Sequence, residues 1–182
     1  MFWTALFSAF AFCAAQTVPA VNQTAYLGRW YQVYSDLAVE ATFENSSYCD
    51  TADYGLYPNG TISVLNRERQ YSVDGPERVI YGWAAAENSA NPGQLTVNLQ
   101  TTEFPAPYWI YQLGPETYNG SLYEYSIVSD PFKLTLFVLA RNLTEFAAYW
   151  QTEVLSWLEK NGFTRLLNTP IATVQDGCTY WY

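Results

Sequence analysis

The residue types that most often carry chemistry are scarce in this chain. Its 182 residues include no histidine, which excludes Ser-His-Asp and Cys-His catalysis, histidine-ligated haem and the usual zinc sites. A catalytic thiol must be free and activated, and Cys49 and Cys178 are better placed for a disulfide. Asp53 and Glu68 have no evident partner for acid–base work. We therefore predict a protein that is not an enzyme, with no metal site and no cofactor.

Several features indicate secretion. Residues 1–15 are apolar, end in small residues and are too short to span a bilayer, which predicts a signal peptide ahead of a single domain at residues 16–182. A buried N-terminal helix is the alternative. An even cysteine pair, Cys49 and Cys178, is typical of a disulfide in an exported chain, whereas a cytosolic protein would hold two free thiols. Five sequons predict N-glycosylation, and they lie at Asn22, Asn45, Asn59, Asn119 and Asn142.

The net charge and the aromatic content of the chain limit the kinds of molecule that it can bind. The formal charge is −9, with only eight basic residues and no run of them. Nucleic acid is therefore excluded as a partner, because phosphate contacts need clustered Lys and Arg. Aromatic residues make up 18% of the chain, and Tyr and Trp suit both strands and pockets with a wet edge.

Short β-type runs separated by turn residues fill most of the chain. Each connection is too short for a crossover helix, which predicts an antiparallel meander, with a longer loop at residues 35–48. Eight such strands tend to close, since closure removes exposed edges, and the resulting barrel is wide enough for one small ligand. The predicted strands are residues 26–34, 49–57, 61–70, 78–85, 94–102, 108–113, 122–129 and 132–141.

The hydrophobic period then changes. Residues 144–160 place five apolar side chains at helical spacing, and Gly162 follows as a stop signal. One amphipathic helix after eight strands must pack its apolar stripe on the outside of the sheet. The predicted fold class is all-β, an eight-stranded antiparallel up-and-down barrel with one C-terminal α-helix packed outside.

Three motifs occur in a characteristic order. The first strand carries Gly28-Arg29-Trp30, the eighth strand ends at Arg141, and a looser motif at residues 123–130 lacks the usual Thr-Asp opening. With these motifs the chain resembles the lipocalin family over roughly residues 25–178, and in particular its apolipoprotein D and bacterial lipocalin branch. The resemblance implies that Arg141 lies across the Trp30 ring at the closed end of a calyx. It also implies a bridge between the second strand and the C-terminus, where the two cysteines stand.

Counting by two from these anchors predicts which side chains face inward. The resemblance implies a secreted carrier of a small hydrophobic ligand, such as a fatty acid, sterol or retinoid. Tyr54, Asn66, Leu99, Phe137 and Leu139 match pocket positions of the apolipoprotein D branch. The predicted ligand-binding residues are Tyr54, Val64, Asn66, Glu68, Val97, Leu99, Phe137 and Leu139.

Other interpretations stay open at this stage. Inward apolar side chains fill a barrel whether or not it holds a ligand. A bilin-binding lipocalin, a lipocalin-fold isomerase and a protein that acts through its surface in interaction or stress protection are the alternatives. The segments at residues 103–108 and 129–132 place aromatic and proline residues beside the entrance. There they would contact a membrane or lipoprotein surface transiently, or fold back as lids.

Overall fold

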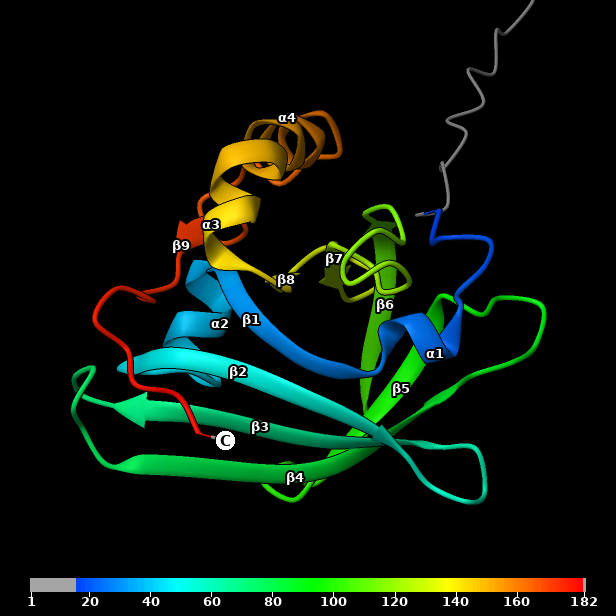
Figure 1. The fold of residues 1–182 in the computed structure, drawn as a ribbon, viewed down its shortest axis with the longest axis horizontal. Coiled ribbons are helices and arrows are strands. Elements are labelled where there is room, and N and C mark those ends of the chain that lie inside the picture. The colour runs from blue at the N-terminus through cyan, green and yellow to red at the C-terminus, as the bar shows by residue number, and fades with distance from the viewer. Residues whose placement is uncertain (1–15, 182) are drawn as a thin grey trace, which may run out of the picture.

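A closed antiparallel β-barrel dominates the structure, a computed structural model that describes residues 16–181. The predicted signal peptide, residues 1–15, lies outside the described part. The strands pair in the order β2-β3-β4-β5-β6-β7-β8-β1, and a β1–β2 pairing closes the sheet (Figure 1). This confirms the predicted fold class. The barrel strands are β1 (Gly28–Ser35), β2 (Ser47–Leu56), β3 (Ile62–Gln70), β4 (Glu77–Ala86), β5 (Gln94–Leu99), β6 (Ala106–Leu113), β7 (Tyr125–Ser129) and β8 (Leu136–Ala140).

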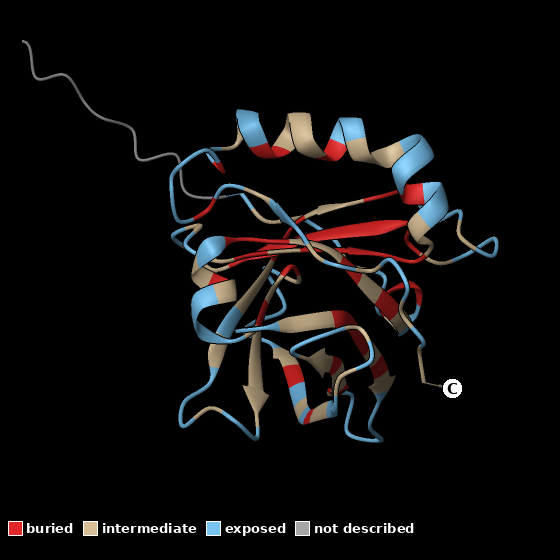
Figure 2. Cartoon of the chain, turned by 90° about the vertical axis from the view of Figure 1, so that its left-hand side faces the viewer, coloured by how far each residue is buried: buried red, intermediate tan, exposed pale blue. Residues whose placement is uncertain are grey.

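The C-terminal helical segment packs on the outside of the barrel, as predicted. It consists of α3 (Leu143–Glu145), the π-helical turn η1 (Phe146–Trp150) and α4 (Gln151–Lys160). Its buried positions face the sheet (Figure 2). They form one core with the outward-facing residues of β7 and β8. Burying such a stripe is the main source of a helix's stability in a globular protein.

Two short helices, α1 (Gln23–Tyr26) and α2 (Leu37–Thr42), lie where the sequence predicts strand or loop. Each begins at a side-chain cap. The Asn22 Oδ1 atom accepts a hydrogen bond from Ala25 N at 3.3 Å, and Asp36 Oδ1 accepts one from Val39 N at 2.9 Å. Such caps stabilise a first helical turn that has no strong hydrophobic period, so periodicity alone does not detect it.

The strand registers show at which end of the barrel each connection lies. Residues 36–46, 71–76, 100–105 and 130–135 join strands at the same end. The first of these connections contains α2. The turn at 130–135 begins β8 later than predicted, because the Asp130 carboxylate accepts hydrogen bonds from the backbone N–H groups of Phe132, Leu134 and Thr135.

The opposite end is closed by Trp30 and Arg141. The Arg141 guanidinium lies 3.6 Å from the centroid of the Trp30 ring, as the resemblance implies. Gly28 has a φ of +91°, and a Cβ there would come within 3.4 Å of Arg141 Nη1. The guanidinium donates to four backbone carbonyl oxygens, those of Arg29 (2.6 Å), Leu27 (2.8 Å), Ala25 (3.0 Å) and Tyr123 (3.3 Å).

The C-terminal segment runs along the outside of β1, β2 and β3. It starts with β9 (Ile171–Ala172), which pairs with the end of β1. A disulfide between Cys49 and Cys178, with Cα atoms 5.6 Å apart, then fixes it to β2. The guanidinium of Arg69 lies over the ring of Trp181, and its Cζ atom is 4.7 Å from the ring centroid. These contacts cover the outer face of strands that line the cavity.

Candidate ligand-binding site

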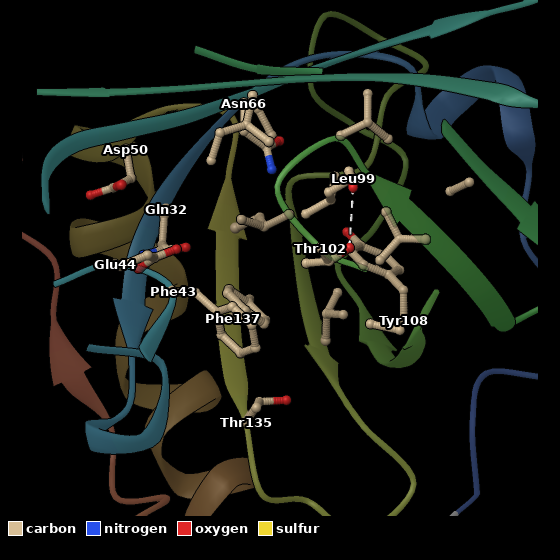
Figure 3. A pocket seen from close by; sticks show the side chains of 18 of the residues that line it. Gln32, Phe43, Glu44, Asp50, Asn66, Leu99, Thr102, Tyr108, Thr135 and Phe137 are labelled. Carbon is tan, nitrogen blue, oxygen red and sulfur yellow. Dashed lines mark hydrogen bonds between the residues drawn. The ribbon is translucent and has the colours of Figure 1, made fainter. Parts of the chain in front are cut away.

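The barrel encloses a cavity of about 720 Å³. Residues of the connections 36–46, 100–105 and 130–135 contribute to its wall, so it reaches the end of the barrel that Trp30 and Arg141 leave open. The lining is mainly apolar, and alternate positions of β3, β5 and β8 contribute part of it. All eight residues that the sequence predicts as ligand-binding lie on this wall: Tyr54, Val64, Asn66, Glu68, Val97, Leu99, Phe137 and Leu139. Figure 3 labels three of them, Asn66, Leu99 and Phe137.

Three tyrosine hydroxyls form a polar cluster on the side of the cavity nearest Trp30. The Tyr108 hydroxyl lies 2.7 Å from that of Tyr26 and 3.1 Å from that of Tyr54. The Tyr26 hydroxyl also lies 3.0 Å from Ser126 Oγ. Burial raises the pKa of Tyr26 to about 12 and raises the pKa values of Tyr54 and Tyr108. The cluster is therefore neutral at physiological pH and offers hydroxyl groups to a ligand.

Tyr108 corrects one expectation. The sequence places it beside the entrance, in the segment 103–108, but β6 already begins at Ala106. Strand alternation then turns the Tyr108 ring into the cavity (Figure 3). The exposed aromatic residue of this connection is Phe104, with 71% of its surface exposed, and Phe132 of the connection 130–135 is 76% exposed.

Acidic side chains gather in the cavity wall toward its open end. Glu44 follows α2, Asp50 lies on β2 and Glu68 on β3, and all three line the cavity. Gln32 Nε2 donates to Glu44 Oε2 at 2.6 Å. Arg78 Nε lies 2.8 Å from Glu68 Oε1. Figure 3 shows Gln32, Glu44 and Asp50 grouped on one side of the cavity.

The charge of this acidic group is perturbed by its surroundings. Burial, together with repulsion from the nearby Glu68 and Glu40 carboxylates, raises the pKa of Asp50 to about 7. Burial, followed by repulsion from Asp50, raises the pKa of Glu44 well above its ordinary value. The pKa of Glu68 is also raised by burial, against the opposing effect of Arg78. The Asp50 carboxyl group therefore retains its proton at mildly acidic pH.

Sequence reasoning found one member of this acidic group, Glu68, and missed the others. Asp50 was within reach, because counting by two back from Tyr54 passes through Ala52 to Asp50. Gln32 follows in the same way from Trp30. Glu44 gave no such signal, since it lies on irregular backbone after α2.

The predicted glycosylation sites differ in accessibility. The Asn22, Asn45, Asn59 and Asn119 side chains are exposed. Asn142 is partly buried, and its Oδ1 atom accepts hydrogen bonds from the backbone N–H groups of Thr144 and Glu145 at the start of α3.

Neither a metal-binding cluster nor a membrane-spanning helix occurs in the described part of the chain. Within residues 16–181 no group of three or more Cys, Asp or Glu side chains is arranged to hold a metal ion. None of the helices in the same part of the chain is long and apolar enough to cross a bilayer.

The amino-acid sequence is similar to a known domain family and to several characterised proteins. The model of the lipocalin-like domain matches residues 21–170. Mouse apolipoprotein D is 40% identical over 93 residues, 51% of this chain and 46% of the mouse protein. The outer membrane lipoprotein Blc of Vibrio cholerae is 33% identical over 120 residues, 65% of this chain and 64% of that protein. The chain thus spans about half the length of the apolipoprotein D sequences that it matches.

Solved structures share the fold at low sequence identity. Insecticyanin from the tobacco hornworm Manduca sexta superposes with a TM-score of 0.62 at 17% identity, over 91% of this chain and 88% of its own. The amine-binding protein of Rhodnius prolixus, solved as its tryptamine complex, gives a TM-score of 0.61, also at 17% identity and with the same shares covered.

Proposed function

The chain belongs to the family of lipocalin-like domains, and we propose that it binds and transports a small hydrophobic ligand in its barrel cavity. The observation that carries this proposal is the cavity of about 720 Å³ with a mainly apolar wall. Cavities of several hundred Å³ with a few placed polar groups are typical of small-molecule sites. The ligand class we propose is a lipid-like molecule such as a fatty acid, sterol or retinoid.

Transport rather than catalysis is supported by the state of the cysteines. An isomerase of this fold that used a thiol would need a free cysteine in the barrel. Cys49 and Cys178 form a disulfide with each other, outside the cavity lining. The tyrosine cluster on the wall is neutral and its hydroxyls are hydrogen-bonded to one another. We therefore propose a carrier without enzymatic activity.

The same features support action outside the cell. A disulfide persists in oxidising compartments, and four of the predicted glycosylation sites are exposed. Phe104 and Phe132 project from connections at the open end of the barrel, 71% and 76% exposed. Exposed apolar side chains beside a cavity entrance suit transient contact with a membrane or lipoprotein surface. We include such contact, with ligand uptake from that surface, in the proposal.

The carrier proposal is tested by mass spectrometry of the protein secreted from a eukaryotic host and deglycosylated. We expect a small molecule that is present in the native mass and lost on denaturation, or binding from an added panel of fatty acids, sterols and retinoids. Val97→Trp fills the cavity from β5 and should abolish binding. The matched control is Thr96→Trp, because the adjacent Thr96 side chain bonds to Glu87 and does not line the cavity.

The experiment distinguishes an error in the carrier proposal from an error in the assignment of the cavity. If wild-type protein carries no ligand and binds nothing in the panel, the carrier proposal is wrong. If Val97→Trp binds as well as wild type, a ligand is bound at another site, and the cavity assignment is wrong. The denatured mass of the same sample also shows whether residues 1–15 have been removed.

A further inference from the structure

The polar part of the cavity wall is rich in acceptors of hydrogen bonds. Asp50 is only 6% exposed and faces the cavity. Its Oδ1 atom is bonded to the Ser47 hydroxyl, but no donor within residues 16–181 bonds to Oδ2. The Oδ1 atom of Asn66, also on the wall, likewise has no donor among the described residues. A buried acceptor without a donor costs about 1–3 kcal/mol, so both atoms favour a ligand that donates.

Both cations of the wall, Arg67 and Arg78, lie in ion pairs, although their Nε atoms form no hydrogen bond among the described residues. Arg78 Nε lies 2.8 Å from Glu68 Oε1, and its Nη2 atom donates to Glu68 Oε2 at 3.0 Å and to Phe43 O at 2.7 Å. Arg67 Nε lies 3.6 Å from Glu77 Oε1. An anionic head group would therefore have to displace an existing ion pair and approach the remaining carboxylates. Like charges at short range in a poorly solvated site repel strongly.

We propose that the ligand carries an ammonium group, which binds between Glu44, Asp50 and Glu68 while its apolar part lies deeper in the barrel. An ammonium group has three N–H donors and no acceptor, which matches the free Oδ2 atom of Asp50. Phe137 lies beside the acidic group and Leu99 lies across the cavity from it, and both supply apolar contact for the rest of the molecule (Figure 3). This inference rests on the proposed carrier function and specifies its ligand class as a cationic amphiphile.

The site also predicts how binding depends on pH. The Asp50 carboxyl group is protonated below about pH 7, because burial raises its pKa to about 7. A bound ammonium group favours the ionised carboxylates and expels that proton, so affinity should rise between pH 5.5 and pH 7.5. The ionisable groups that face Asp50 from neighbouring elements are Glu40, Glu44, Glu68, Arg67 and Arg78.

The test compares three probes with the same alkyl chain, namely dodecylamine, dodecanol and dodecanoate, by calorimetry on the full chain at pH 7.5. We expect dodecylamine to bind about tenfold or more tightly than dodecanol, the range of one charge-assisted hydrogen bond. Dodecanoate should bind weakest. Asp50→Asn should weaken dodecylamine binding by about tenfold and leave dodecanol within about twofold. Glu44→Gln tests the same cluster from a different element.

The matched control is Asp74→Asn, which changes the net charge equally at an exposed position of the connection 71–76. It should leave all three affinities unchanged. If dodecanol or dodecanoate binds as tightly as dodecylamine, or if Asp50→Asn and Glu44→Gln leave the dodecylamine affinity intact, the ammonium inference is wrong while the carrier function stands. If none of the three probes binds and the lipid panel also fails, the carrier function itself is wrong.

Discussion

Replacing Arg141 with Met should destabilise the closed end of the barrel. Met fills a similar volume and packs on the Trp30 ring, but it cannot donate to the four backbone carbonyl oxygens that Arg141 contacts. The Arg141 side chain is buried, so water has little access to the donors that it presents to those acceptors. The Arg141→Met protein keeps its cavity lining, because Arg141 does not contribute to that wall.

The magnitude follows from three contributions. Four carbonyl oxygens each lose one donor, at about 1 kcal/mol each, and the loss of the cation–π contact with Trp30 adds about 2 kcal/mol. Removing a buried guanidinium returns part of this, since burial opposes its charge and lowers its pKa to about 10. We expect a net loss of about 3–4 kcal/mol in the free energy of unfolding. For a chain of this size the melting temperature should fall by roughly 10 °C.

Urea unfolding followed by tryptophan fluorescence measures this loss. Arg141→Lys keeps the charge without the planar fork and should lose about half as much. Arg165→Met is the control, because Arg165 is exposed and its substitution should change stability by less than about 0.5 kcal/mol. A loss below about 1 kcal/mol for Arg141→Met would refute the view that this contact holds the barrel closed.

Three further predictions concern the tether, the acidic site and the tyrosine cluster. Replacing Cys49 and Cys178 together with Ser should cost about 4–5 kcal/mol in thermal melts, because the bridge closes a separation of 129 residues. The raised pKa of Asp50, about 7 against an ordinary 3.8, means that the folded state binds this proton more tightly. Stability should therefore fall as pH rises from about 4 to 7 in urea titrations, less steeply in Asp50→Asn. Tyr108→Phe should lose about 1–2 kcal/mol, since it removes the hydroxyl shared by the other two tyrosines.

The sequence predicts the barrel well because one physical pattern repeats along it. Alternating side chains and short turns specify antiparallel strands with little ambiguity, and the change to helical spacing after residue 143 marks the outer helix. The errors occur where a single side chain reorganises the backbone. Asp36 caps α2 inside a predicted loop, and Asp130 holds residues 132–135 in a turn inside a predicted strand. Such local hydrogen bonds compete with strand pairing without leaving a periodic signal.

The candidate site also has a part that follows from regular strand alternation and a part that does not. Its apolar wall follows from the two-residue period of regular strands, which is why Val64, Val97 and Leu99 could be placed from the sequence. The polar groups that distinguish one ligand from another follow this period only in part, because some of them lie where the backbone departs from regular strand pairing. Glu44 follows a capped helix, and Asp50 lies at the irregularity in the β2–β3 register between Tyr48 and Thr51. Two chains with the same strand pattern can therefore share this barrel and its apolar wall and still differ in the charge presented at the open end, so ligand class must be inferred from those irregular segments.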